Sequence, residues 1–596
     1  MSTRLQTAAV PVAAGLAGLG LVAAGVAPGW MAQAIPADIS PQIVRYARQM
    51  LAATGLLLLC AAFFFAAVDP ARHQRWSAAL SLDGWAPRLA ALAVLLYIAV
   101  YFPFTAQRYW HFNAGVYDLG VQDQVVWNTA HGRWYASSIE VGNYMGDHFK
   151  PLVALLAPFY LIAPSVYWLL AFQTVVLALG AVPVYRLAQR RLGAPGFGLL
   201  FALLYLLYPS VGYVNRFDFH WEAAAIPLLL AAVDDTDAKR WRRASLWLAL
   251  ALLSKEDIGL TVAAFGLWLA WRRQALRFGL AWAATGIGFA LFAMFVIIPA
   301  FRAAPSDSFV RYLWLGADPI EMLRNLLLRP DLVLPRLLGV DAVRFVVSFT
   351  APLLFLPFAH TIILVALPAA VYNLLSTEMA QRVAYFHYVA PIVPFVIAAA
   401  LLASARIFAW ARRVQAYWLV WTICTGLLIF TGWHSLVFNN PLADDGAVPP
   451  AWTRLPNEAA VRQALSLIPP EAAVLTTNYY GTHLAHRTDL YLMFAPADTT
   501  GLEPAELALF NTIDYRSHHP WACQDYAAAL QQAHDQGFGL VYNVERVVLV
   551  QRAAGDRAAL RELASALCRD EPHASEHASE HAHEHAHEHA YEEVQP

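Results

Sequence analysis

Charged residues are scarce in this chain. Only 14% of its 596 residues are Asp, Glu, Lys or Arg, and 59% are hydrophobic. A soluble domain usually carries about 25% charged residues, so this scarcity excludes a wholly soluble protein and indicates one that crosses a membrane several times. The formal net charge of −2 offers no excess of positive charge, which argues against nucleic acid as a partner. The apolar runs lack the alternation of barrel strands, so we expect helices.

Cysteine is scarce too, with four residues in the whole chain. Cys60 and Cys424 lie inside apolar runs, where they are expected to pack. Cys523 and Cys568 lie in the polar C-terminal region, and they could form a disulfide if that region faces an oxidising compartment. Chance placement of these two thiols is the alternative.

Long apolar stretches are plentiful. About thirteen of them could cross a membrane, although several are shorter than the ~20 residues of a straight span. They lie near 8–28, 49–68, 86–104, 165–185, 197–214, 217–233, 244–254, 257–271, 278–300, 346–359, 361–375, 386–404 and 416–434. The first could be a cleaved signal peptide, but its length and the many spans that follow favour an uncleaved signal anchor.

Basic residues indicate how these spans are oriented. If the spans alternate, the basic clusters all fall on one side, which the positive-inside rule makes cytoplasmic. These clusters are 72–75, 186–191, 239–243, 272–277 and 406–413. The N-terminus is then inside, and the region after residue 434 is outside.

The run "ASLWLALALLSKEDIGLTVAAFGLWLAW" tests this orientation, because it could be one helix with three charged residues at its middle. Three ionised groups at the bilayer centre would cost roughly 3 kcal/mol each. A single helix would also separate the basic clusters 239–243 and 272–277. We therefore expect two short helices that meet at an exterior turn, Ser254–Asp257.

Aromatic and charged residues gather in the segments that this topology places outside, which predicts a site on one face of the membrane. These segments are 105–150, 214–222, 254–257, 301–345 and 376–388. The first contains "NAGVYDLGVQDQVVWNTAHGRWY", in which 121–130 predicts a helix lying at the membrane–water interface with Asp118 near its N-terminus. An ionised carboxylate is favoured there, and it suits a general base or a metal ligand. A solvated loop with an interfacial aromatic belt is the alternative.

Three further clusters accompany this segment, namely "VNRFDFHWEAA", "SKED" and "QRVAYFHYVAP". Polar residues at membrane depth are usually functional, although the first cluster could also be an ion-paired helix cap. The candidate substrate-binding residues of the four clusters are Tyr117, Asp123, Asp147, His148, Arg216, His220, Glu222, Lys255, Glu256, Asp257, Arg382, His387 and Tyr388.

Five motifs carry a resemblance to a known family. "YDLGVQDQVVWNTAHG", "GDHFKPLVALLAPFYLIAPS", "FDFHWEA", "LLSKED" and "HYVAPIVPF" resemble, in this order, a bacterial family of predicted membrane proteins with no assigned activity. That family is considered similar to the GT-C superfamily of membrane glycosyltransferases, and the resemblance covers roughly 86–500. It implies a protein of the bacterial inner membrane that takes a polyprenyl-phosphate-linked sugar donor. The acceptor, a lipid, glycan or protein, would approach from the exterior, periplasmic face.

The resemblance also implies roles for two carboxylates. The superfamily's essential acidic residue lies in the first exterior loop, where Asp118 matches, and Asp218 matches a second acidic position. Leu119 follows Asp118, so the acidic dipeptide of many members is absent. Such chemistry needs a carboxylate to take the acceptor's proton, and it needs Arg, Lys, His or a divalent metal beside the departing phosphate.

We therefore expect a mostly α-helical fold with four parts. They are N-terminal transmembrane helices over 1–85, a GT-C-like multi-pass domain over 86–435, a soluble exterior α/β domain over 440–570 and a disordered tail over 571–596. In the third part, "AAVLTT", "DLYLMF" and "GFGLVYNVERVVLVQR" predict strands, and 523–535 and 556–568 predict helices. His483 and His486 could contact a substrate there, although a role in stabilising the fold is the simpler expectation.

The tail is rich in His and Glu and cannot bury a core. Its histidines could bind Zn²⁺, Ni²⁺ or Cu²⁺ weakly, and a repeat without a role is the alternative. The candidate ligands are His577, His581, His583, His585, His587 and His589.

Two other functions compete with a glycosyltransferase. A transporter or flippase of a lipid-linked glycan would distribute polar residues through its spans and often show related halves. No internal repeat is visible, and the polar clusters lie at one face. A non-catalytic envelope assembly protein would leave Asp118 and Asp218 without a role.

Overall fold

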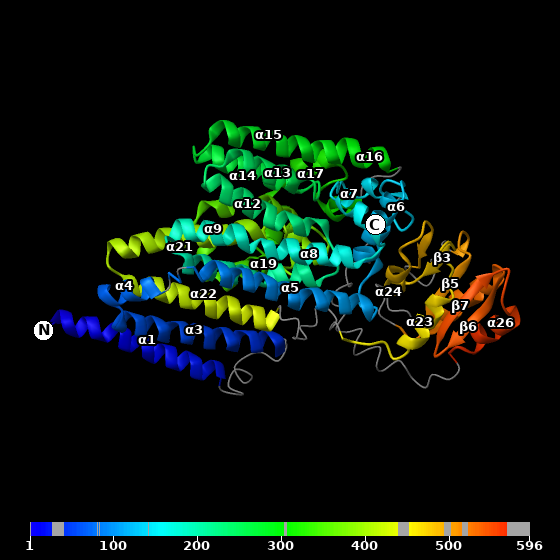
Figure 1. Ribbon diagram of the computed structural model, residues 1–596, viewed down its shortest axis with the longest axis horizontal. Coiled ribbons are helices and arrows are strands. Elements are labelled where there is room, and N and C mark those ends of the chain that lie inside the picture. Colours follow the sequence, from blue (N-terminus) through cyan, green and yellow to red (C-terminus); the bar gives the residue numbers. More distant parts are fainter. Residues whose placement is uncertain are drawn as a thin grey trace.

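Helices dominate the structure. The computed structural model describes residues 2–26, 41–79, 81–82, 84–140, 142–302, 307–438, 452–493, 502–514 and 523–568. The expected fold class is confirmed, because a bundle with long apolar helices is followed by a small α/β domain. Figure 1 shows the bundle helices running side by side, with the C-terminal domain at one end of the bundle.

The bundle begins with α1 (Ser2–Val26), α3 (Pro41–Ala67), α4 (Pro70–Ala79) and α5 (Ala86–Trp110). A segment with η1 (Val116–Gly120), α6 (Val121–Ala130), β1 (Ala136–Ser137), β2 (Gly142–Asn143) and η2 (Tyr144–Gly146) follows. The central helices are α7 (Val153–Ile162), α8 (Tyr167–Leu179), α9 (Ala181–Leu192), α10 (Pro195–Leu206), α11 (Pro209–Arg216), η3 (Trp221–Ala224), α12 (Ala225–Asp237), α13 (Trp241–Leu252), α14 (Ile258–Trp271), α15 (Leu276–Phe292), η4 (Ala293–Ile297) and α16 (Ile298–Phe301). The last ones are η5 (Asp307–Leu315), α17 (Pro319–Leu328), α18 (Pro330–Leu337), α19 (Val340–Thr350), η6 (Ala351–Leu353), η7 (Leu356–Ala359), η8 (Thr361–Ala366), α20 (Leu367–Leu375), η9 (Met379–Arg382), η10 (His387–Val389), α21 (Val393–Arg413) and α22 (Tyr417–Phe438).

Six described helices are long and apolar enough to cross a membrane. They are Tyr46–Ala67, Ala86–Trp110, Tyr167–Leu192, Leu276–Phe301, Val393–Arg413 and Tyr417–Phe438. The pair α10 and α11 would make a seventh, bent by 45°. Tyr208 is extended at this bend because Pro209 follows it, and the residue before a proline avoids the helical region. Several of the other expected spans are shorter apolar helices, so the number thirteen stays a prediction.

The "SKED" turn separates two helices. α13 ends at Leu252 and α14 begins at Ile258, with Lys255 and Glu256 buried between them. The basic segments on either side reach the same end of the bundle. Arg243 pairs with Asp235 of α12 at 3.1 Å. Three arginines from three of the basic clusters lie close enough to His360 to interact with it electrostatically, namely Arg191, Arg272 and Arg406. Two antiparallel helices, α13 and α14, place the basic segments next to them at the same end of the bundle, as observed here.

Small residues allow α14 and α15 to pack backbone against backbone. A Cβ added at Gly266 would lie 2.5 Å from the carbonyl oxygen of Gly279, and one added at Gly259 would lie 2.6 Å from that of Gly286. No side chain fits at such distances. The pair therefore has the close contact that drives helix association in membranes, where apolar burial alone gives little preference.

The C-terminal domain is a five-stranded mixed sheet with helices on both faces. Its strands are β4 (Leu490–Leu492), β3 (Val474–Thr476), β5 (Leu507–Asn511), β7 (Val547–Arg552) and β6 (Phe538–Val544), in spatial order. β3 is parallel to β4 and β5, whereas β7 is antiparallel to β5 and β6. The helices are α23 (Glu458–Ser466), α24 (Asn478–Gly481), η11 (Thr482–Leu484), α25 (Cys523–Asp535) and α26 (Arg557–Ala566). The sequence analysis missed β5.

The two faces of this sheet have different partners. One face packs against α25 and α26, where a disulfide joins Cys523 to Cys568. The other face packs against α23 and also buries Phe112 and Val116, which belong to the segment after α5. The first exterior segment is therefore part of the domain's hydrophobic core.

Candidate active site

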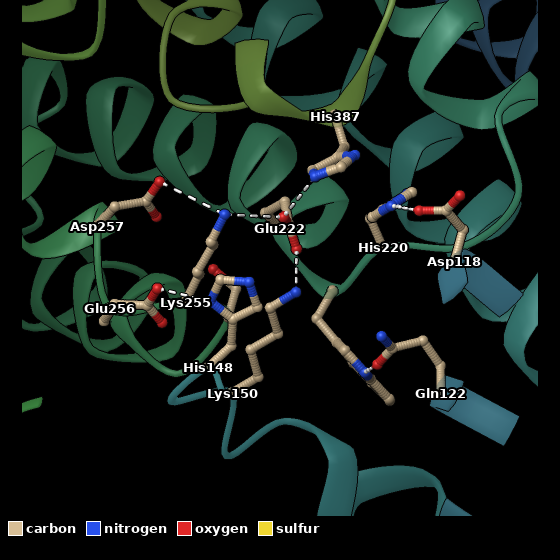
Figure 2. A network of polar contacts seen from close by, with 12 residues as sticks. Asp118, Gln122, His148, Lys150, His220, Glu222, Lys255, Glu256, Asp257 and His387 are labelled. Atoms are coloured by element: carbon tan, nitrogen blue, oxygen red, sulfur yellow. Dashed lines mark hydrogen bonds and ion pairs between the residues drawn. The ribbon is translucent and has the colours of Figure 1, made fainter. Parts of the chain in front are cut away.

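The segments that the sequence analysis predicts to be exterior meet at the end of the bundle next to the C-terminal domain. Figure 2 shows a network of polar contacts in which side chains from four of these segments point toward one another. The labelled residues are Asp118, Gln122, His148, Lys150, His220, Glu222, Lys255, Glu256, Asp257 and His387. The structure thus brings together most of the residues that the sequence analysis selected.

Asp118 lies on η1, a single π-helical turn between α5 and α6. Its side chain is 28% exposed, whereas the next two residues are buried. His220 Nε2 lies 3.0 Å from Asp118 Oδ1, and a hydrogen on Nε2 makes this contact a hydrogen bond to the carboxylate. Short π-helical turns often occur at functional sites. A buried imidazole therefore orients a carboxylate that is itself open to solvent.

Helix α6 has the predicted bounds but a different setting. It was expected at the membrane–water interface, yet almost all of its residues are buried. The reason is that its apolar residues pack against α7 within the bundle, while polar contacts join this region to the C-terminal domain. Gln124 Nε2 donates to the carbonyl of Arg487 at 3.1 Å, and the Ser138 hydroxyl donates to the carbonyl of Leu490 at 2.9 Å.

Asp218 lies behind the Asp118 turn and holds it in place. Its Oδ1 accepts a hydrogen bond from Arg108 at 3.0 Å, and its Oδ2 accepts one from the backbone N–H of Gly115 at 2.8 Å. Burial raises the pKa of the Asp218 carboxyl, Arg108 opposes that shift, and Asp118 adds to it. With both oxygens occupied, this geometry supports an anchoring role for Asp218 rather than the expected catalytic one.

His220 also contacts the second half of the network. Its ring stacks on that of His387, with ring centroids 3.5 Å apart. His387 Nε2 lies 3.4 Å from Glu222 Oε1. The same carboxylate pairs with Lys150 at 3.2 Å and with Lys255 at 3.3 Å. Two ammonium groups and an imidazole therefore surround the buried carboxylate of Glu222.

The charges of this cluster depend on one another. Burial alone would raise the pKa of the Glu222 carboxyl, but the ammonium groups of Lys150 and Lys255 outweigh it and hold that pKa well below its usual range. Burial lowers the pKa of His387, and the stacked His220 lowers it further, so the pKa lies well below its ordinary value. His387 is therefore neutral near pH 7 while Glu222 is ionised.

The "SKED" turn adds two more ion pairs. Lys255 lies 3.8 Å from Asp257, which accepts a hydrogen bond from the Tyr372 hydroxyl at 2.9 Å. Glu256 lies 2.9 Å from His148 Nδ1. Burial would raise the pKa of Glu256, yet His148 outweighs it and lowers that pKa to about 2.

Tyr388 forms an aromatic wall beside the network. Lys255 lies 5.5 Å and Arg311 lies 5.8 Å from the centroid of its ring. Its ring centroid is also 4.0 Å from that of His387. Arg311 comes from η5 and was not selected from the sequence. The two cations flank one half-buried aromatic ring near Asp118.

Several predicted residues lie at the edge of this network or outside it. Asp123 faces the C-terminal domain, Arg216 is buried against Phe104 and Tyr213, and Arg382 pairs with Asp341 near the surface. Tyr117 packs against the core of the C-terminal domain. Asp147 lies 3.5 Å from His148 and 3.8 Å from Arg302, at the rim.

His486 forms an ion pair between the C-terminal domain and α6. Its Nε2 lies 3.0 Å from Asp123 Oδ2, and Asp123 also accepts a hydrogen bond from the Tyr160 hydroxyl. Burial lowers the pKa of His486, and the positive charge of Arg487 lowers it further. The contact with Asp123 outweighs both effects, so the pKa is raised above 6.5. Because the folded-state pKa is raised, this pair contributes stability that is present below the unfolded pKa and is lost as the pH rises through the folded pKa.

We therefore expect a pH-dependent difference in melting temperature between the wild type and His486→Gln. The wild type should melt higher near about pH 6, and the difference should shrink toward about pH 9 as His486 loses its proton. Thermal unfolding in detergent micelles measures it. His131→Gln, which alters an exposed histidine, is the control and should show no such trend. A difference that stays constant over this range would contradict the assignment.

A divalent metal was one expectation for the acidic residues, and it stays a prediction. In the described ranges, no group of three or more His, Cys, Asp or Glu side chains has the spacing of metal ligands. Asp218 is occupied by two hydrogen-bond donors, and Asp118 faces His220. The six tail histidines lie outside the described residues.

Sequence reasoning missed three polar residues that hold the site. Arg108 and Arg311 lie in segments that the positive-inside rule predicts to be exterior, where basic residues are unusual, and that imbalance was a usable signal. The sequence contains no such signal for Asn478, because this residue lies in the C-terminal domain and contacts the Asp118 turn only in the folded chain.

Comparison with known proteins places this site within a family. A family model described as "Predicted membrane protein (DUF2079)" matches residues 108–518, which include Asp118, the network and part of the C-terminal sheet. No curated protein matches the chain. Among solved structures, the chain is similar to ArnT from Cupriavidus metallidurans, in a crystal structure bound to undecaprenyl phosphate and in one of the apo state. The identities are 12% and 14% and the TM-scores 0.41 and 0.42, over 78% of this chain and 98% of that chain in both cases.

Proposed function

The chain belongs to the family described as predicted membrane protein (DUF2079), and we propose that it is a membrane glycosyltransferase. It would transfer a sugar from a polyprenyl-phosphate-linked donor to an acceptor hydroxyl on the exterior face. One observation carries the proposal: Asp118 presents a solvent-accessible carboxylate, oriented by buried His220, beside a network of buried cations. The five motifs that resemble, in order, a family considered similar to the GT-C superfamily support it.

Asp118 is suited to act as the general base. An acceptor O–H loses its proton to the Asp118 carboxylate while its oxygen forms a bond to the anomeric carbon of the sugar. The bond between that carbon and the donor's phosphate oxygen breaks, and its electron pair leaves with the phosphate. His220 keeps the carboxylate in position through the contact between its Nε2 and Asp118 Oδ1.

The departing phosphate needs positive charge. Lys255 and Arg311 flank the Tyr388 ring, so a phosphate lying against that ring would meet an ammonium and a guanidinium together. Lys255 is available as a cation at neutral pH, because burial would lower its pKa but Asp257 and Glu222 outweigh it and raise that pKa. Such preorganised charges stabilise the leaving group without reorganisation during the reaction.

The proposal is tested with purified protein in lipid nanodiscs. A panel of polyprenyl-phosphate sugars with different head groups is supplied, and the loss of donor and release of polyprenyl phosphate are measured. We expect one donor to be consumed by transfer, or by slow hydrolysis when no acceptor is present. If no donor is consumed, but a lipid-linked glycan crosses the bilayer of proteoliposomes, the protein is a transporter instead.

A further inference from the structure

The turn that carries Asp118 begins without a cap of its own. The first N–H groups of a helical turn have no partner inside it, and a nearby side chain normally satisfies them. Here the preceding residue, Gly115, has no side chain to offer. Two residues from distant parts of the chain do this instead. Asp218 accepts from Gly115 N at 2.8 Å, and Asn478 Oδ1 accepts from Val116 N at 2.8 Å.

The two caps come from opposite sides. Asp218 belongs to the bundle and Asn478 opens α24 of the C-terminal domain, so the turn is held between them. A Cβ placed on Gly115 would lie 3.3 Å from the Asn478 side chain and 3.6 Å from Asp218 Oδ2. A side chain at this position would therefore press on the Asn478 amide, so the turn and its caps are closely packed.

Further contacts tie the same stretch to the C-terminal domain. The Thr482 hydroxyl donates to the carbonyl of Ala114 at 3.0 Å. Phe112 and Val116 are fully buried in the core between the sheet and α23. Asn113 Nδ2 also donates to the carbonyl of Thr453 at 2.8 Å. Two apolar anchors and three hydrogen bonds, the one to Asn478 included, therefore hold residues 112–116, immediately before Asp118.

We propose that the C-terminal domain is part of the active site, and that Asn478 is the positioning residue that sets the Asp118 turn from its outer side. The Asn478 amide does not reach the reacting atoms. It acts by accepting a hydrogen bond from the Val116 N–H. Without this acceptor the N–H would be buried and unsatisfied, which favours a different backbone conformation of the turn. The expected effect of Asn478 on catalysis rests on the proposed function, whereas its effect on the conformation of the turn does not.

The structural part is tested by hydrogen–deuterium exchange of the full-length protein in nanodiscs. In Asn478→Ala, the amides of 113–120 should exchange roughly tenfold faster or more, while those of β3 and β5 keep wild-type protection. Asn478→Asp retains an oxygen acceptor and should restore protection. Glu458→Gln is the matched control, since it weakens a 3.0 Å contact with His111 in the same interface but away from the turn. Unchanged exchange of 113–120 in Asn478→Ala would overturn the proposal, as would equal acceleration in Glu458→Gln.

The catalytic part is tested on whichever donor the wild type consumes. Asn478→Ala should lower kcat about tenfold and leave KM for the donor within about twofold, because the residues around Tyr388 come from other segments. Asn478→Asp should recover kcat. A loss that appears in KM alone would assign Asn478 to substrate binding and overturn a positioning role. If the wild type consumes no donor, the proposed function fails, and the exchange experiment still decides whether Asn478 holds the turn.

Discussion

Asp118→Asn is expected to lower kcat for sugar transfer by about 10²–10⁴-fold, the usual contribution of a positioned general base. The amide has nearly the shape of the carboxylate and can still accept a hydrogen bond from His220, so the turn should keep its structure. It cannot accept the acceptor's proton. The loss should therefore appear in kcat, with KM for the donor little changed.

The measurement is steady-state transfer by both proteins in nanodiscs, with size-exclusion profiles and melting temperatures recorded alongside. Asp331→Asn is the control, since Asp331 is an exposed carboxylate that pairs with Arg329. It should retain full activity. If Asp118→Asn keeps more than about a tenth of wild-type kcat while folded, Asp118 is not the base.

Glu222→Gln is expected to destabilise the protein by about 3–5 kcal/mol, because breaking a buried ion pair leaves charge without compensation. The Glu222 side chain is 2% exposed and is shared by Lys150 and Lys255, which are themselves 3% and 8% exposed. Its loss would leave Lys150 without an ion-pairing partner among the described residues. Lys255 would keep only the longer contact with Asp257.

The measurement is thermal or denaturant unfolding in detergent micelles. The double variant Glu222→Gln/Lys150→Met should recover part of the lost stability, because it removes the uncompensated ammonium as well. Asp341→Asn breaks a half-exposed pair with Arg382 and should cost less than about 1 kcal/mol. A loss for Glu222→Gln no larger than that of this control would show that Glu222 is not essential to the network.

The sequence predicted the bundle well, because its signals are local. Hydrophobic runs locate helices, and the cost of charges in a bilayer divides 244–271 into two of them. The strand β5 was missed for a local reason too. Leu507–Asn511 is buried on both faces at the centre of the sheet, so it shows no alternation of polar and apolar residues. A short apolar run of this kind does not distinguish strand from helix.

The sequence did not predict which residues of the site contact one another. Composition and position selected Asp118, His220, Glu222 and His387, but not which of them pair. Asp218 looked equivalent to Asp118 in the sequence, and only the structure shows that its oxygens are occupied by Arg108 and a backbone N–H. These contacts join residues more than a hundred positions apart, where no periodicity or spacing rule applies.

The backbone contact of α14 with α15 also determines which side of the site can move. Gly259 follows the "SKED" turn by two residues, and its place against Gly286 prevents sliding or rotation of the two helices past each other. Lys255 and Asp257 therefore lie at the end of a closely packed, rigid helix pair. The residues beside Tyr388 are held differently, because η9 and η10 are 3-10 turns of four and three residues and, among the described residues, have no such backbone contact with a long helix.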